Sequence, residues 1–485
     1  MHNTLLIHLL RELQNDSLPV FDDFIRSPFF NKSKTVIKLW DVVKKYGPDY
    51  KSDKLEREKI FAVLFPGKEY NYGTMKNLLH SLNRVIERFL MQTELEAFRF
   101  QQNYNLVRGA IVYNVSDFFK KRFDKTIEEY ENHTEVLNLH FLEKLKLMEM
   151  RNALSGIESR TSKLIFDESD ALLNFFFIKL FMIYSNTKSL KIDSSIIDEN
   201  DSLDMFLSAV NLEKVMKFIE NKKPQDFKIT GLYYYMYLAR KEPANDEYFL
   251  QFKKSLETSE VKFGEFELSD LFTCLLNVTS ERVYLGKTNS VKEKAEVLKL
   301  MLDKNILFNA NSSTISFRMF GTVLQALLSA EEFDYSQQFY KKYQHLLQES
   351  DKENMDNYYY AHKYFFEGDY YRALEYSSKI KPELDHYKNH IKDIQLKSYF
   401  EQNDYDSFEY YLDAYRQFIY RNKTISEKNR QFYINYFNAL NSLFKFKISH
   451  DSSLDEIKVM VENNRMWDKE WIIKKLEEIE QKNIR

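Results

Sequence analysis

The sequence predicts an all-α protein in which a right-handed α-solenoid of antiparallel helix hairpins follows an N-terminal helical domain. Three observations lead to this fold class. Glycine and proline occur only 10 and 7 times in 485 residues, which is too few turn residues for a strand-rich sandwich or barrel. Apolar residues recur with the 3.6-residue period of a helix. Similar stretches also recur in the C-terminal half, and such self-similarity is typical of repeat proteins.

Residues 1–95 form the predicted N-terminal helical domain, whose helices are short because four of the seven prolines lie there. Stop signals at Gly47-Pro48 and Pro66-Gly67 separate the periodic segments. An apolar stripe at the i, i+3, i+4 and i+7 spacing begins at Met75 and continues to Leu90. The expected helices cover residues 3–14, 19–26, 34–46, 53–65 and 72–95.

Residues 96–200 are predicted to be a long-helix segment that joins the two domains. Its most apolar window, Leu172–Tyr184, contains Asn174 and Lys179. The window is shorter than the roughly 20 apolar residues that a bilayer requires. It is therefore expected to be a buried helix, and the chain is not expected to span a membrane. The polar run Lys188–Asp204 is the expected linker.

Residues 201–485 are predicted to form a degenerate array of helix hairpins with a C-terminal capping helix. The aromatic residues Phe333, Tyr370 and Tyr405 are 37 and 35 residues apart and lie in three similar stretches. Each stretch follows one aromatic-rich helix and precedes another, so each marks the turn of a hairpin. The three stretches are Glu331–Ser336, Gly368–Ala373 and Asn403–Phe408.

The middle stretch resembles a tetratricopeptide repeat. In that family a small residue, an aromatic residue, a glycine, a second aromatic residue and an alanine recur at set positions. Here these positions hold Ala361, Tyr364, Gly368, Tyr370 and Ala373. The small residues let two antiparallel helices approach each other, and the glycine permits the tight turn. This resemblance directly covers the region from about residue 315 to about residue 450 and implies a superhelix with a concave groove.

The flanking stretches depart from the repeat pattern, because Glu331 and Asn403 replace the glycine while Ser336 and Phe408 replace the alanine. A second resemblance rests on the Ser-Pro-Phe-Phe-Asn element at Ser27–Asn31. The element is similar to one near the start of a group of uncharacterised bacterial all-helical proteins. This second resemblance implies a helical fold and no activity.

The sequence has no motif that indicates catalysis, a cofactor or a metal. Gly67 and Gly73 lack the Gly-Lys-Ser/Thr ending of a nucleotide loop. His386 and His390 have a spacing that can bind zinc, but the glutamate of H-E-x-x-H is absent between them. Cys274 lies in an apolar run and is expected to be a buried structural thiol. The chain is therefore not expected to be an enzyme or to hold a cofactor.

The C-terminal tryptophans allow two interpretations. Trp467 and Trp471 are four residues apart, beside Lys469 and Lys474. They are expected to belong to a helix that caps the exposed end of the array. A ligand-stacking site is the alternative.

The leading functional hypothesis is a non-catalytic cytoplasmic scaffold that binds a partner protein or peptide in the concave groove. A single cysteine fits a reducing compartment. In repeat arrays the first helix of each hairpin lines the groove, and such a surface suits an extended peptide or an amphipathic helix. The positions expected to face the partner are Arg318, Gln325, Tyr358, His362, Phe365, His390, Asp393 and Lys397.

Two alternatives remain open. A regulator could contact nucleic acid through the N-terminal helices, with the array as a sensor. The first hundred residues carry 16 basic and 13 acidic side chains, a net charge of +3, which argues against a nucleic-acid partner. The connection Gly47–Lys54 is also longer than the turn of a helix-turn-helix motif. The second alternative is an enzyme without a recognisable motif.

Overall fold

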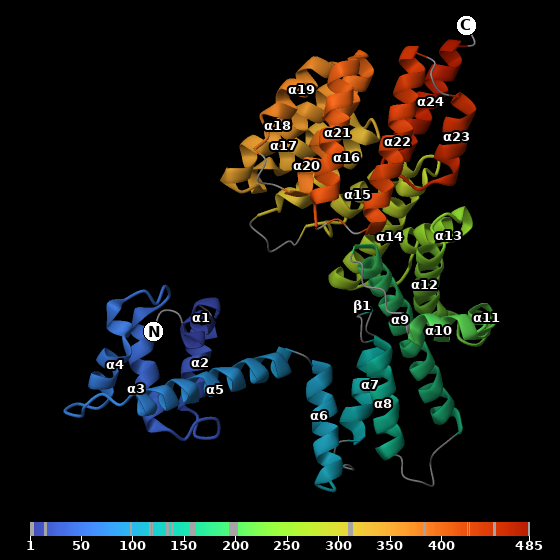
Figure 1. Cartoon of the computed structure of the whole chain (residues 1–485). Helices are drawn as coiled ribbons and strands as arrows, with labels where there is room; N and C mark the ends of the chain where they lie inside the picture. Colours follow the sequence, from blue (N-terminus) through green and yellow to red (C-terminus); the bar gives the residue numbers. More distant parts are fainter. Residues whose placement is uncertain are drawn as a thin grey trace. The chain divides into compact units, whose positions relative to one another are not determined.

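The computed structural model describes residues 4–13, 17–97, 99–115, 118, 120–131, 135–136, 140–154, 162–193, 202–308, 314–381, 385–423, 425, 427–449 and 453–483. In this part of the chain the predicted all-α class is confirmed (Figure 1). The described strands are β1 (Glu135–Val136) and β2 (Lys262–Phe263), which form one short parallel pair. The chain divides into two compact units. Unit 1 comprises residues 1–132 and 146–160, and unit 2 comprises residues 133–145 and 161–485.

The first five helices of unit 1 lie where the sequence predicts them. The α-helix over 34–43 continues as a short 3-10 turn over 44–46, and the 3-10 turn over 53–55 precedes the fourth helix. The prolines and their adjacent turns therefore do divide this region into short helices. The five helices are α1 (Leu5–Glu12), α2 (Ser17–Arg26), α3 (Lys34–Val43), α4 (Arg57–Leu64) and α5 (Tyr72–Ala97).

Asp22 joins α2 to α3 in unit 1. Its carboxylate accepts hydrogen bonds from the indole N–H of Trp40 at 2.7 Å, from Lys44 at 2.7 Å and from Arg26 at 3.0 Å. These donors, Arg26 foremost, hold the pKa of Asp22 well below its usual range.

A smaller apolar cluster joins the remaining helices of this unit: α6 (Arg99–Val112), α7 (Lys120–Glu131) and the part of α8 (His140–Leu154) from residue 146 onward.

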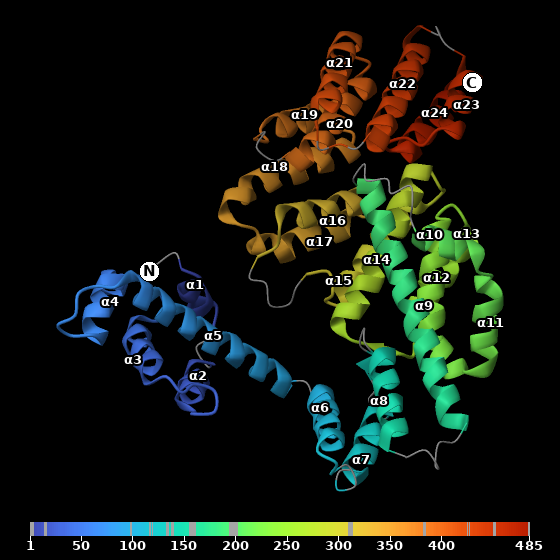
Figure 2. The same cartoon turned by 60° about the horizontal axis from the view of Figure 1, so that its bottom comes forward.

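Unit 2 begins with helices that pack around one large apolar core. The long helix α9 (Ser162–Asp193) packs along α12 (Pro224–Lys241) (Figure 2). The helices before residue 305 are α9 (Ser162–Asp193), α10 (Ser202–Ala209), α11 (Leu212–Lys222), α12 (Pro224–Lys241), α13 (Asp246–Glu257), α14 (Glu265–Leu285) and α15 (Ser290–Asp303).

The later helices of unit 2 contact one another largely in chain order, and the last of them returns to contact α14. Their cores are the continuation of the large cluster and a second cluster toward the C-terminus. These helices are α16 (Phe317–Ser329), α17 (Phe333–Tyr343), α18 (Glu349–Phe366), α19 (Tyr370–Ser378), α20 (Asp385–Gln402), α21 (Tyr405–Arg421), α22 (Glu427–Ser449), α23 (Leu454–Asn463) and α24 (Lys469–Asn483).

The three stretches that the sequence aligns as turns share one backbone geometry. Glu331, Gly368 and Asn403 all have left-handed φ angles, of 61°, 80° and 58°. Each donates its N–H to the carbonyl three residues earlier, and the next residue donates to the carbonyl five residues earlier. This pair of backbone hydrogen bonds is the Schellman motif, which closes the C-terminus of a helix. Glycine adopts this φ without strain, whereas Glu331 and Asn403 adopt it at a conformational cost.

The residues that follow these turns share two further features. The three helices begin at the aligned aromatics Phe333, Tyr370 and Tyr405. At the offset where the middle stretch has alanine, the side chains of Ser336, Ala373 and Phe408 are fully buried. Because this side chain is fully buried in all three stretches, it packs against neighbouring side chains in each of them.

Two expectations about α9 need correction. The run Leu172–Tyr184 is buried on one face only, because Leu172, Phe176 and Ile183 are exposed. The linker was expected to begin at Lys188, but α9 continues to Asp193. Residues 194–201 lie outside the described residues.

Candidate functional site

The structure buries most of the residues expected to line a groove. Tyr358 is 0% exposed and Lys397 is 4% exposed, and His362, Phe365 and Asp393 are also buried. The expectation that these five side chains face a partner is therefore wrong. Arg318 is exposed on α16. The two remaining positions, Gln325 and His390, are partly buried and line one common cavity.

The C-terminal segment covers Lys397 on α20, whereas α18, which carries Tyr358, His362 and Phe365, is covered by α16, α19 and α20. Lys397 on α20 forms ion pairs with Asp393 at 2.6 Å and with Asp468, which lies just before α24. Lys475 on α24 pairs with Glu401 on α20 at 2.7 Å. The predicted capping helix therefore packs onto the side of α20 that was expected to be open.

Lys397 is the centre of a buried ion cluster. Asp393 also accepts a hydrogen bond from the hydroxyl of Tyr436 at 2.6 Å. Burial lowers the pKa of Lys397, but the carboxylates of Asp393 and Asp468 outweigh this effect, so its pKa is raised. Burial raises the pKa of Asp393. Two carboxylates thus surround one ammonium group, which they hold in its charged form.

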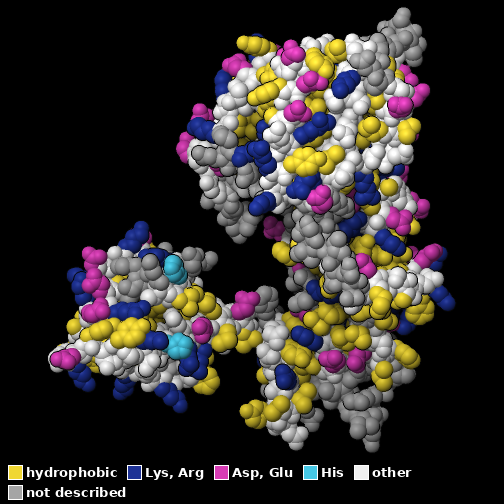
Figure 3. Space-filling model, in the orientation of Figure 1, with side chains coloured by type: hydrophobic (Ala, Val, Ile, Leu, Met, Phe, Trp, Pro, Cys, Tyr) yellow, Lys and Arg dark blue, Asp and Glu magenta, His cyan; other side chains and the backbone are white. Residues whose placement is uncertain are grey.

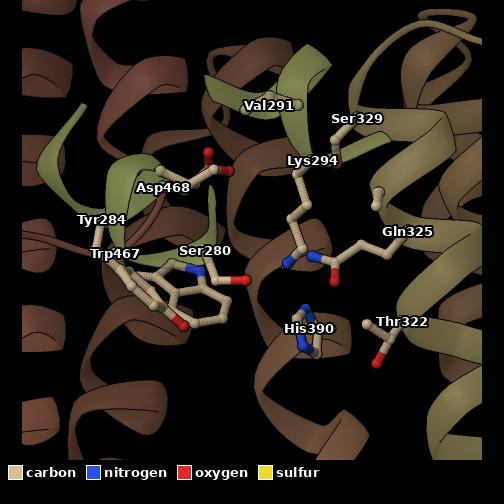
Figure 4. Close-up of a pocket in the computed structure, with 12 residues that line it drawn as sticks. Ser280, Tyr284, Val291, Lys294, Thr322, Gln325, Ser329, His390, Trp467 and Asp468 are labelled. Carbon is tan, nitrogen blue, oxygen red and sulfur yellow. The ribbon is translucent and has the colours of Figure 1, made fainter. Parts of the chain in front are cut away.

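The cavity lies between four helices and the loop that precedes α24. Its volume is about 180 Å³. Figure 4 shows Lys294, Gln325 and His390 pointing toward one another, with Ser280 and Trp467 on the opposite wall. The lining comes from α14 (Ser280, Val283, Tyr284), α15 (Val291, Lys294), α16 (Thr322, Gln325, Ala326, Ser329), α20 (His390) and the loop (Trp467, Asp468).

Lys294 is the uncompensated charge of this cavity. Its ammonium group has no hydrogen bond or ion pair to any residue that the structure describes. Burial lowers the pKa of Lys294. Burial also lowers the pKa of His390 to about 3, helped by the positive charges of Lys294 and Lys397. His390 is therefore neutral at physiological pH, and Lys294 is the basic group of the lining that no carboxylate balances.

Trp467 contributes a second unsatisfied donor. Its ring stacks on Tyr433 with centroids 5.0 Å apart, and Tyr284 and His390 lie beside it at 5.8 and 5.3 Å. The indole Nε1–H is buried and has no hydrogen-bond partner among the described residues. With one face of the ring covered by Tyr433, this side chain serves the cavity as a donor and a wall.

Sequence reasoning missed Lys294, although a signal for it exists. On α15 the buried residues Ala295, Leu298 and Met301 define an apolar face. Lys294 lies three residues after Val291 and four before Leu298, so its spacing places a lysine on that face. A lone lysine in an apolar stripe is a recognisable exception to the helical pattern.

A second candidate surface lies on α9, opposite its buried side. Successive spacings of 7, 4, 7 and 7 residues place five side chains within about 40° of one another around the helix. All five are large and apolar, with exposed fractions between 40% and 60%. We name them the α9 stripe: Ile165, Leu172, Phe176, Ile183 and Leu190.

The histidine pair and the cysteine that the sequence analysis considered do not form a reactive or metal site among the described residues. No group of three potential metal ligands occurs among the described residues, and the side chain of His386 lies outside them. Cys274 is partly buried against Ser185, with Sγ and Oγ 3.3 Å apart, and burial raises the pKa of its thiol. A thiol of raised pKa is a poor nucleophile.

The comparisons with known proteins do not add a family. No family model, curated protein or solved structure matches the chain. Within the described ranges, none of the helices is both long and apolar enough to cross a bilayer. On the face of unit 1 that Figure 3 shows, Lys and Arg side chains are interspersed with Asp and Glu. That face is not the continuous basic surface that a nucleic-acid regulator would need.

Proposed function

We propose that the chain is a non-catalytic scaffold that binds an amphipathic helix of a partner protein along the α9 stripe. The α9 stripe is the observation that carries this proposal. Spacings of 7, 4, 7 and 7 residues are those of a seam between two packed helices. From Ile165 to Leu190 the stripe extends over about 38 Å, at 1.5 Å per residue. That length suits a partner helix of about seven turns.

The energetics favour a covered stripe. Burying a large apolar side chain contributes about 1.5–3 kcal/mol, and five such side chains are exposed together on one helix face. Large contiguous apolar patches on soluble proteins are typical of interaction sites. The opposite face of α9 is held in the core by Phe177 and Phe181, so the helix is rigid and preorganised for docking.

The proposal includes a tetratricopeptide-like arrangement of the helices from α14 to α21. It is supported by the shared turn geometry at Glu331, Gly368 and Asn403. Helix α14 also ends at a left-handed glycine, Gly286, and α15 ends before a left-handed asparagine, Asn305. In this proposal the array is the support that holds α9 in place, and the partner binds outside the predicted groove.

Photo-crosslinking tests the proposal directly. Benzoylphenylalanine replaces Leu172 or Ile183 in the full chain expressed in its native cells, and exposed Lys254 on α13 is the control position. We expect both stripe positions to give the same heavier product, which contains a second protein crosslinked through a helical amphipathic segment. The control position should not give this product.

A variant with two introduced negative charges provides the matched loss of function. Leu172→Glu with Phe176→Glu should remove the crosslink from position 183, because two carboxylates interrupt the apolar seam. Both residues are exposed, so each substitution should change the free energy of unfolding by less than about 0.5 kcal/mol. A crosslinked product that contains only peptides of this chain, or equal yields at position 254, would contradict the proposal.

A further inference from the structure

We propose that the cavity around Lys294 is a binding site for a small carboxylate anion, with an apolar part about the size of a benzene ring. This inference does not rest on the proposed scaffold function. The site is built from α14, α15, α16, α20 and the loop before α24, whereas the α9 stripe lies on another helix. Four observations carry it: charge, donors, apolar walls and size.

The carboxylates near the cavity are paired with basic groups other than Lys294. Asp468 lines the wall, but its carboxylate is paired with Lys397, whose ammonium also pairs with Asp393. The acidic neighbours of Lys294 on its own helix are engaged elsewhere, since Glu293 pairs with Arg282 at 2.9 Å and Glu296 with Lys253 at 2.7 Å. The ammonium of Lys294 therefore faces the cavity without a counterion from the described residues.

The polar lining is rich in hydrogen-bond donors. Besides the ammonium of Lys294, the buried indole N–H of Trp467 lacks an acceptor among the described residues. The hydroxyl of Ser280 and the side-chain amide of Gln325 also line the cavity (Figure 4). A buried donor without an acceptor costs about 1–3 kcal/mol. A carboxylate can accept from several of these groups at once, so the bound anion would remove that cost.

The rest of the cavity wall is apolar and favours a ligand whose part beyond the carboxylate is apolar. Val283, Tyr284, Val291 and Ala326 provide this surface. The cavity volume is about 180 Å³, and an engineered protein cavity of about 150 Å³ accommodates benzene. A carboxylate of the size of benzoate therefore matches both the donors and the available space.

The same features disfavour a phosphate group. A phosphate dianion is best held by several positive groups or a helix N-terminus, whereas this cavity has one uncompensated lysine. The paired carboxylate of Asp468 on the wall would also repel a second negative charge. A monocarboxylate needs only one countercharge, and it favours the ammonium form of Lys294 in return.

The test is calorimetric titration of the full chain with sodium benzoate, sodium acetate and inorganic phosphate. We expect benzoate to bind with a Kd of about 1 mM or lower, with acetate weaker because it leaves the apolar wall empty. Lys294→Met keeps the stem of the side chain and removes the charge, so it should weaken benzoate binding about tenfold or more. Trp467→Phe, which removes the N–H donor, should weaken binding by a smaller factor.

Lys292→Met is the matched control, because Lys292 lies on the same helix and is exposed. This variant should bind benzoate like the wild type. Lys294→Gln serves as a second variant if Lys294→Met alters the thermal unfolding curve. The proposal is overturned if benzoate shows no saturable binding up to about 10 mM. It is also overturned if Lys294→Met and Lys292→Met bind equally well, or if phosphate binds more tightly than benzoate.

Discussion

His362 illustrates at the residue scale how burial changes the chemistry of one side chain. Its Nδ1 lies 2.9 Å from the carbonyl oxygen of Tyr358 and is assigned as the N–H donor of that bond. Burial lowers its pKa to about 3, whereas the pKa of an unfolded histidine is about 6.5. Protonation therefore favours the unfolded state, so stability declines as the pH falls below about 6.5 and the decline continues to about 3.

This shift predicts a pH-dependent stability. Between about pH 7 and about pH 5.5, protonation linked to His362 should lower the free energy of unfolding by about 1 kcal/mol. In His362→Asn, the amide can still donate to Tyr358, but it cannot titrate. Urea unfolding at both pH values should show this share of the pH dependence in the wild type and not in the variant. An equal pH dependence of the two proteins would contradict the assignment of His362 as a buried neutral group.

At the scale of the element, the turn that ends a helix at Gly368 also forms at two positions without glycine. Gly368 adopts its left-handed φ without strain, and the same turn forms at Glu331 and Asn403. The buried side chains that follow, Ser336 and Phe408, differ greatly in volume. The same turn geometry therefore forms with three different turn residues and with three different buried side chains after the turn.

Ala373 provides the test of this packing. Its side chain is fully buried in α19, so Ala373→Arg should overpack the contact between helices and bury a charge. The expected cost is about 1–3 kcal/mol for overpacking, and more for an unpaired charge. Thermal unfolding should show a clear loss of stability. Tyr371→Arg is the control, because Tyr371 is exposed on the same helix, and an equal effect of the two substitutions would contradict the hairpin contact.

At the scale of the whole molecule, the C-terminal segment holds the middle of unit 2. The carboxylate of Glu470 on α24 accepts hydrogen bonds from Ser290 and from the N–H of Val291, at 3.3 and 3.4 Å. It thereby satisfies donors at the N-terminus of α15, 179 residues earlier in the chain. Glu293, three residues after Ser290, is not available for these donors because it pairs with Arg282.

The ion cluster predicts how strongly this closure contributes. Lys397→Met leaves the carboxylates of Asp393 and Asp468 without their counterion, so it should lower the free energy of unfolding by about 3–5 kcal/mol. Lys474→Met removes an exposed ion pair of α24 with Glu331 and should cost less than about 1 kcal/mol. Denaturant unfolding of both variants measures the difference. Equal stability of the two would show that the buried cluster does not hold the segment in place.

The sequence predicts the local structure well, for a physical reason. Helix periodicity, prolines and turn residues act over a few neighbouring positions, so the five helices of residues 1–95 and the turns at Gly368 and Asn403 could be located from them. Burial of Ala373 also follows from its place in the repeat. Such properties depend on the spacing of residues along one or two helices.

The candidate site depends on contacts between distant segments, and these could not be predicted from spacing. Offsets along the predicted array assigned Gln325 and His390 to an open groove, and in the structure both line one cavity. They also assigned Tyr358, His362 and Lys397 to an open surface, because no local pattern shows that neighbouring helices cover α18 or that α24 returns to pack on α20. Lys294 stands out in the sequence only as a lysine in an apolar stripe.

The sequence by itself determined the all-α class, the five helices of residues 1–95 and the turns at Glu331, Gly368 and Asn403, because these depend on short-range periodicity and backbone preference. Only the tertiary structure decided which helix faces remain open. It buries most of the positions that were expected to line a groove, leaves the α9 stripe exposed, and places Lys294 and Trp467 around one cavity. Burial is a property of packing between segments far apart in the chain, so neither the stripe nor the cavity can be read from any single helix.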